Sequence, residues 1–281
     1  MQSYRRSIAI LIAVVATASW VVLITAQTSP QVVAEPVRES GQSVTGAFEG
    51  WYRNPDGTFS LLLGYFNRNS KQILDIPVGP NNRIEPGNPD QGQPTHFAPR
   101  RQWGVFRVVV PKDFGNKKLT WTIVANGQTT TIPMGLNPLY VVDPFKDAGN
   151  GNTPPVIKFE PEGTAFTGPP HGIARMLTTK LSVPLALTLW VSDDRPMRGG
   201  RGTPPLAWSM FRGPADVTFE SERPAADAPQ GKTVTTAKFT APGEYILRVQ
   251  ANDSTGDGGG GFQCCWTNVH VKVTVNPDTG N

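Results

Sequence analysis

The sequence predicts an all-β protein with two β-sandwich domains in tandem after an N-terminal signal segment. First, its 281 residues include 29 glycines and 27 prolines and only 17% charged residues, which favours short strands and turns over long helices. Second, apolar and polar residues alternate in many short runs, as in half-buried antiparallel strands. Third, Asn126-Gly127 separates two such runs and is a strong hairpin signal.

Residues 1–26 have the features of a signal peptide. Arg5 and Arg6 form a basic start, residues 8–24 are almost wholly apolar, and Ala26 is a small residue suited to cleavage. Because the apolar run approaches membrane-spanning length, an uncleaved signal anchor is the alternative. The protein is therefore expected to be exported, either periplasmic or secreted, or else anchored at its N-terminus.

The rest of the chain is close to neutral. Without Arg5 and Arg6 the count is 24 basic against 22 acidic residues, a net charge of +2. This balance argues against a nucleic-acid partner. Residues 27–42 are polar with a few small apolar residues and are expected to form a disordered leader.

The first predicted domain spans residues 43–146. Its second strand is mostly apolar, which predicts burial on both faces. Residues 79–99 contain five prolines, three glycines and three asparagines and are predicted to be a loop. The predicted strands are 44–51, 58–66, 72–78, 103–110, 119–125 and 129–134, with 139–142 closing the sheet.

Residues 147–155 (DAGNGNTPP) are predicted to be a short polar linker to a second domain at residues 156–276, followed by a tail at 277–281. In its last strand, Val269 and Val271 are expected to face the core, whereas Asn268 and His270 face solvent. The predicted strands are 156–160, 181–192, 206–211, 217–220, 233–240, 245–252 and 267–275.

Alternation is clearest after the turn Ala241-Pro242-Gly243. Tyr245, Leu247, Val249 and Ala251 point one way, and Glu244, Ile246, Arg248, Gln250 and Asn252 point the other. Gly243-Glu244-Tyr245 fits a tyrosine corner, in which the Tyr hydroxyl bonds back across a turn. Tyr245 is therefore expected to be buried and hydrogen-bonded, and Trp208 is expected to pack between the sheets.

Three segments of the second half resemble polycystic-kidney-disease-type (PKD-like) domains of bacterial exported proteins. They are WSMFRGPADVTF at residues 208–219, AKFTAPGEYILRVQAND at 237–253 and VSDD at 191–194. The resemblance implies an immunoglobulin-like sandwich in an extracellular, usually non-catalytic module. The first half resembles no family in the same way, and fold alone does not give function.

No catalytic motif is present. His96, His171 and His270 fall in unrelated settings, and the sequence has no Gly-x-Ser-x-Gly, His-Glu-x-x-His or P-loop pattern. The protein is therefore predicted not to be an enzyme and to need no cofactor. Calcium is the alternative, because loops at a sandwich end can gather carboxylates. Its candidate ligands are Asp193, Asp194, Asp253 and Asp257, which otherwise serve as turn residues.

The two cysteines, Cys264 and Cys265, are neighbours. Export places them in an oxidising compartment, which favours a vicinal disulfide that stiffens a Gly-rich loop. A redox pair or a soft-metal site is the alternative.

Two long loops, 193–205 and 253–266, are predicted to emerge at one end of the second sandwich. The candidate partner-binding residues on them are Arg195, Arg198, Arg201, Phe262 and Trp266. Arginines suit a carboxylate-bearing partner, and the aromatics either stack on sugar or plug the sandwich end. The partner is expected to be an envelope protein, a glycan or the first domain of the same chain.

Three functions follow from these observations. The first is a non-catalytic protein acting in binding, adhesion or assembly at the cell envelope. The second is an accessory module that binds polysaccharide. The third is an enzyme with a site in the N-terminal domain, for which a pocket beside His96 would be required.

Overall fold

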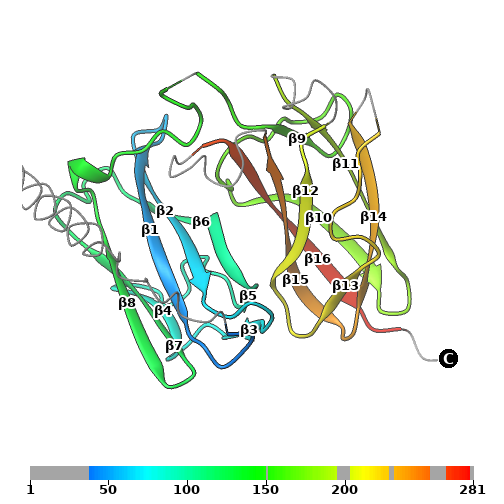
Figure 1. The fold of residues 1–281 in the computed structure, drawn as a ribbon, viewed down its shortest axis with the longest axis horizontal. Coiled ribbons are helices and arrows are strands. Elements are labelled where there is room, and N and C mark those ends of the chain that lie inside the picture. The colour runs from blue at the N-terminus through cyan, green and yellow to red at the C-terminus, as the bar shows by residue number, and fades with distance from the viewer. Residues whose placement is uncertain (1–37, 150, 195–202, 228–230, 254–263, 279–281) are drawn as a thin grey trace, which may run out of the picture. The chain divides into compact units, whose positions relative to one another are not determined.

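The computed structural model describes residues 38–149, 151–194, 203–227, 231–253 and 264–278, which belong to one compact unit that begins at Arg38. Within these residues the chain forms sixteen strands and one short 3-10 helix, η1 (Pro138–Tyr140). The predicted all-β class is therefore confirmed (Figure 1).

The N-terminal β region, residues 43–146, contains three antiparallel sheets. Their strand orders are β1-β2-β6, β4-β7-β8 and β3-β5. The strands are β1 (Val44–Arg53), β2 (Phe59–Asn67), β3 (Leu74–Asp75), β4 (Asn82–Glu85), β5 (His96–Phe97), β6 (Arg100–Val110), β7 (Leu119–Ala125) and β8 (Gln128–Met134). As predicted, β2 is buried along most of its length, and Asn126 and Gly127 take the positive φ angles of a tight hairpin turn between β7 and β8.

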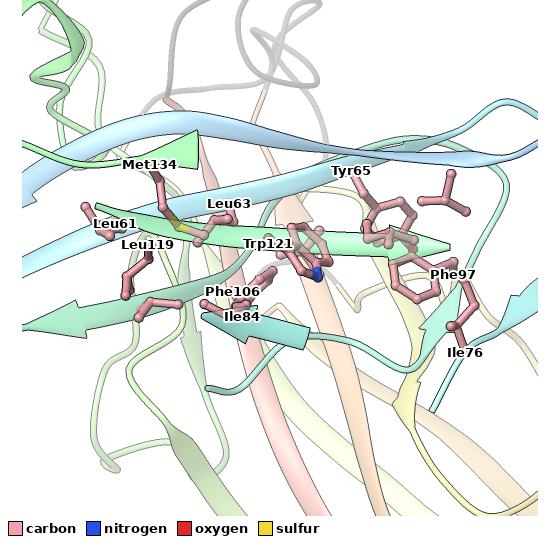
Figure 2. Packing of buried hydrophobic residues seen from close by; sticks show 14 of the residues in the cluster. Leu61, Leu63, Tyr65, Ile76, Ile84, Phe97, Phe106, Leu119, Trp121 and Met134 are labelled. Atoms are coloured by element: carbon pink, nitrogen blue, oxygen red, sulfur yellow. The ribbon is translucent and has the colours of Figure 1, made fainter. Parts of the chain in front are cut away.

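Trp121 on β7 is at the centre of the core of this region (Figure 2). Its ring meets Phe106 of β6 edge-on, with the ring centroids 5.1 Å apart, and its Nε1 donates to Asn82 Oδ1 at 2.9 Å. A Cβ at Gly46 of β1 would lie 2.8 Å from the Trp121 ring. Glycine at this position therefore lets β1 cross directly over the indole.

Two predictions for this region were wrong. Residues 79–99 are not a loop throughout, because β4 and β5 lie within them. Asn82 is buried there, and its Nδ2 donates to the carbonyls of Ile76 and Pro94 at 2.9 and 2.7 Å, so a polar side chain organises the segment. Residues 139–142 form no strand: η1 is followed by a single bridge between Trp51 and Val141.

The C-terminal sandwich, residues 156–276, has two four-stranded sheets, ordered β10-β16-β15-β12 and β13-β14-β11-β9. The strands are β9 (Val156–Lys158), β10 (Ile173–Lys180), β11 (Leu185–Ser192), β12 (Leu206–Arg212), β13 (Val217–Phe219), β14 (Lys232–Phe239), β15 (Gly243–Asn252) and β16 (Trp266–Asn276). β10 was not predicted. It is a largely exposed edge strand, so it lacks apolar alternation, and it pairs parallel to β16.

The interior of this sandwich agrees with the sequence. Tyr245 is fully buried and its hydroxyl donates to the Ala241 carbonyl at 2.7 Å, which confirms the tyrosine corner. Trp208 is buried in the same core, as expected. The valines of β16 alternate into this core.

The other face of the β15–β16 pair does not face solvent, which corrects a prediction. Arg248, Gln250, Asn268 and His270 are all buried. The reason is that the N-terminal β region packs against this face, through hydrogen bonds described below. We call it the outer face of the sheet.

Candidate functional site

The residues predicted at the loop end are only partly within the described chain. Arg195, Arg198, Arg201, Asp257 and Phe262 lie outside it. Asp194 Oδ2 accepts a hydrogen bond from Thr153 Oγ1 at 2.9 Å. Asp253 is buried and accepts one from Asn152 Nδ2. Asp193 also has an interaction partner.

Among the described residues no group of three or more His, Cys, Asp or Glu side chains is placed to hold a metal ion. The calcium hypothesis also includes Asp257, and it stays a hypothesis.

Cys264 and Cys265 are joined by a disulfide and are buried. The predicted linker folds back onto them. The Asn152 carbonyl lies 3.5 Å from Cys265 Sγ, and the Asp147 N–H donates to the same carbonyl at 2.8 Å. Asn152 also holds Asp253, and Thr267 Oγ1 donates to the Pro155 carbonyl, so residues 151–155 contact the start of β16.

Trp266 is 1% exposed, so its ring is not available at the surface for stacking on sugar. It packs with Tyr52 and Leu62 of the N-terminal β region. A Cβ at Gly104, whose φ is +51°, would lie 1.7 Å from the indole. The surface that Trp266 meets belongs to the same chain.

The outer face is joined to β6 by side-chain hydrogen bonds. Asn268 Nδ2 donates to the carbonyls of Trp103 and Gly104, each at 3.0 Å. His270 Nε2 lies 3.1 Å from the Val105 carbonyl, which only accepts, so this nitrogen carries the proton. Burial, with Arg248 adding to it, lowers the pKa of His270 to about 3, so the ring is neutral.

At the other end of this contact β12 has an irregular register between Met210 and Arg212. Phe211 is thereby placed in the core of the N-terminal β region. Arg212 makes a two-pronged ion pair with Asp90, at 2.8 and 3.0 Å, and its Nε donates to the Gln93 carbonyl at 2.7 Å. The Arg212 hydrogen bonds hold the pKa of Asp90 below its ordinary value.

Where β6 faces β12 and β15 there is a cleft of about 370 Å³, which we take as the candidate site. β6 forms one wall, and β12 and β15 form the other. Sequence reasoning missed it, since its residues come from both halves of the chain. Those that carry charge or hydrogen-bonding capacity include Arg101, Gln102, Trp103, Arg223, Arg248 and Gln250.

A buried carboxylate supports the first wall. Glu49 of β1 accepts from Arg101 Nη2 at 2.6 Å and from the Gly104 N–H at 2.8 Å. Burial raises the pKa of Glu49, while Arg101 and the Gly104 N–H oppose the rise. The Arg101 guanidinium also lies 3.8 Å from the centre of the Trp103 ring. These contacts fix the direction of Arg101 at the edge of the cleft.

The second wall contributes Arg248, which is 5% exposed. Its Nη2 donates to Gln102 Oε1 at 2.8 Å and to Gln250 Oε1 at 3.2 Å. Arg223 is exposed at the rim. Three arginines and one glutamate, Glu222, therefore line the cleft, a net charge of +2.

His96, the residue on which the enzyme hypothesis depends, does not line this cleft. It faces Asp75 across the β3–β5 pair, with Nδ1 and Oδ1 2.7 Å apart. Within the described residues the cleft lining includes no histidine or cysteine, and its one serine is Ser209. A nucleophile–base pair of the usual kind is thus not formed by these lining side chains.

The fold is that of an all-β chain whose C-terminal half is a two-sheet sandwich. No protein-family model matches the sequence, and no curated protein matches it. The described residues contain no helix with the length and apolar character of a membrane span.

Solved structures with similar folds are remote. A PKD domain is 18% identical over 39% of this chain and 86% of its own, with a TM-score of 0.23. The D00-D0 domain of intimin is 12% identical over 83% and 99%, with a TM-score of 0.27. The sialic acid binding region of a Streptococcus sanguinis adhesin is 11% identical over 85% and 78%, with a TM-score of 0.25. At these scores the matches do not establish a family or a function.

Proposed function

We propose that this is an exported, non-catalytic protein acting in binding, adhesion or assembly at the cell envelope, and that its cleft binds a ligand with carboxylate groups. The observation that carries the proposal is the convergence of Arg101, Arg223 and Arg248 on one cleft. Guanidinium groups present planar forks of donors that match the two oxygens of a carboxylate.

The cleft is organised before a ligand arrives. Arg101 is held by Glu49 and by the Tyr65 and Gln102 carbonyls, at 3.1 and 2.7 Å. Side chains that are already ordered lose little rotamer freedom on binding, which strengthens binding for a given set of contacts. Arg223 is exposed and supplies the adaptable contact.

Two kinds of partner fit this chemistry: an acidic envelope protein, or an acidic polysaccharide bound by an accessory module. A glycan array with carboxylated and neutral sugars separates them, together with pull-downs from envelope extract. Binding to uronate sugars supports the polysaccharide-binding role, and recovery of a protein without sugar binding supports the first role.

Arg223→Ala is the decisive variant, because an exposed arginine is removed without disturbing the core. We expect affinity for the recovered ligand to fall about tenfold, the equivalent of about 1.4 kcal/mol, within the range for a hydrogen bond to a charged group. Arg53→Ala is the matched control, since Arg53 is exposed and does not line the cleft. Equal affinity of Arg223→Ala and wild type, or equal binding of neutral and carboxylated ligands, would overturn the proposal.

A further inference from the structure

A second surface of the N-terminal β region has the features of a binding groove. It has a volume of about 650 Å³ and lies beside the segment that follows β8. Phe48, Met134 and Leu136 supply apolar lining, Tyr140 adds an aromatic ring, and Lys117 and Lys118 add positive charge. None of these residues lines the cleft, and no sequence motif indicated the groove.

The segment beside the groove exposes an unusual amount of apolar surface. Leu139, Tyr140 and Val141 are consecutive and are 88%, 53% and 56% exposed. Single exposed apolar residues are common, but a contiguous patch of them indicates an interaction site. Tyr140 is the one of the three that also lines the groove.

The aromatic wall is held rigidly on β1. Trp51 Nε1 donates to the Asn137 carbonyl at 2.7 Å, and the Val142 N–H donates to the Trp51 carbonyl at 3.0 Å. A Cβ at Gly50, whose φ is +120°, would lie 2.6 Å from the Tyr140 carbonyl oxygen. The absence of a side chain at Gly50 therefore lets the segment sit directly on the strand.

The two aromatic rings of the groove lie at an angle to each other. The centroids of Phe48 and Tyr140 are 5.8 Å apart, and their planes are tilted by 53°. Aromatic faces carry negative charge density, which attracts the positively polarised C–H groups of a pyranose ring. Two ring faces that are tilted to each other and bordered by polar groups can each stack on a different sugar of a chain. They are less suited to a single flat ligand.

The positive charge of the groove lining favours acidic sugars over neutral ones. Among the described residues, the groove lining contains Lys117 and Lys118 and no acidic side chain. Both lysines are exposed, so their ammonium groups can meet carboxylates spaced along a polymer.

An acidic peptide is the other polyanion that the lysines would accept, and the strand edge argues against it. Within the part of the chain that the structure describes, β8 is an edge strand whose sheet partner is β7 alone. A peptide that adds to such an edge needs a row of backbone N–H donors. Pro133 on β8 lines the groove and has no N–H, so the row is interrupted where the groove begins.

We propose that this groove is a second binding site, for an acidic oligosaccharide that stacks on Tyr140 and Phe48 and pairs its carboxylates with Lys117 and Lys118. The site is separate from the arginine-lined cleft, so each can fail without the other.

The test is calorimetric titration of the whole protein with three probes: a hexamer of galacturonate, a neutral glucose hexamer and hexaglutamate. We expect the galacturonate hexamer to bind and the other two to bind at least about tenfold more weakly. Tyr140→Ala should weaken galacturonate binding about tenfold, and Tyr140→Phe should restore most of it, because the ring is retained. Lys117→Ala with Lys118→Ala should weaken it further and reduce its dependence on salt.

Val234→Ala is the matched control, since Val234 is apolar, 51% exposed and outside the groove. Arg223→Ala separates the two sites, because it should leave the groove titration unchanged. A galacturonate signal lost in Arg223→Ala but kept in Tyr140→Ala would assign the sugar to the cleft and overturn the groove proposal. Tighter binding of hexaglutamate, or no binding of the galacturonate hexamer, would overturn it as well.

Discussion

On β15 and β16, Leu247 and Val271 face the interior of the C-terminal sandwich, whereas Arg248 and His270 face the N-terminal β region. All four of these residues are buried. The inner face is stabilised by apolar area and close packing. The outer face is stabilised by hydrogen bonds from buried polar groups, such as those of Asn268 Nδ2 and His270 Nε2 to carbonyls of β6. Alternating polarity thus identifies two faces, but it does not say whether the polar face meets water or a polar interface.

The most severe test of this difference between the two faces is to remove the N-terminal β region. A fragment of residues 154–276 contains both sheets of the sandwich, so we expect it to fold, with dispersed NMR signals and a β-type circular dichroism spectrum. We also expect a lower melting temperature than in the whole protein, because Phe211 and Trp266 lose their cover. A fragment that is unfolded by both measurements would show that the two halves are not separate domains.

The inner face should respond most strongly to truncation. Trp208→Ala should lower the free energy of unfolding by about 3–5 kcal/mol, the range for a large buried aromatic. Trp190→Ala, at a half-buried position on β11, is the control and should cost less. A loss below about 1 kcal/mol for Trp208→Ala, measured by urea denaturation, would mean that Trp208 is not a core residue.

The outer face should respond most strongly to added volume. In Gly104→Ala the new methyl group would meet the Trp266 ring, and we expect a loss of about 1–3 kcal/mol from overpacking, with about 1 kcal/mol more from the positive φ. Gly41→Ala isolates the second effect, since Gly41 also has a positive φ but nothing lies within 4 Å of its Cβ position. Equal losses for the two variants in urea denaturation would show that Trp266 does not pack tightly against β6.

These contrasts explain which parts of the fold could be predicted. Tyr245 and Trp208 were placed correctly because a core is recognised from local alternation and turn chemistry. β10 was missed because edge strands are selected by pairing with a neighbour and need no apolar alternation. β4 was missed because its anchor is a buried polar residue, Asn82, in a segment rich in proline.

The candidate site was harder to predict than the fold. Arg101 and Arg248 meet only because the two halves of the chain pack together, and their separation in sequence hides this. One signal was present: Arg248, Gln250, Asn268 and His270 are four polar residues on neighbouring strands with few charges of opposite sign among them. A solvated sheet face usually mixes Lys and Glu, as at Lys272 and Glu244, which pair on the exposed part of the same sheet.

The outer face should also make stability depend on pH. The pKa of His270 is about 3 in the folded protein and about 6.5 when unfolded, so the unfolded chain binds the extra proton between these values. Stability should therefore fall as the pH drops below about 6.5, by up to about 1.4 kcal/mol per pH unit for this one proton. His270→Gln keeps a donor for the Val105 carbonyl and removes the titration. Urea denaturation between about pH 7 and about pH 4 should give a flatter curve for the variant, whereas parallel curves would contradict a buried neutral histidine.

The smallest effect on stability is expected from reducing the disulfide between Cys264 and Cys265, which immediately precede β16. On the proposal that the protein is exported, we expect the disulfide to be present in protein taken from the envelope, because that compartment is oxidising and the chain contains no other cysteine. A link between neighbours restricts the unfolded chain little, so reduction should cost only about 1 kcal/mol by the chain-entropy relation. Both sulfurs are buried, so the thiols must be alkylated in denaturant, with and without prior reduction, before the intact mass is measured. Mass added only after reduction confirms the bond. Two thiols alkylated without reductant would show that the pair is reduced in the envelope, and the alternative of a redox or soft-metal pair would then be the one to test.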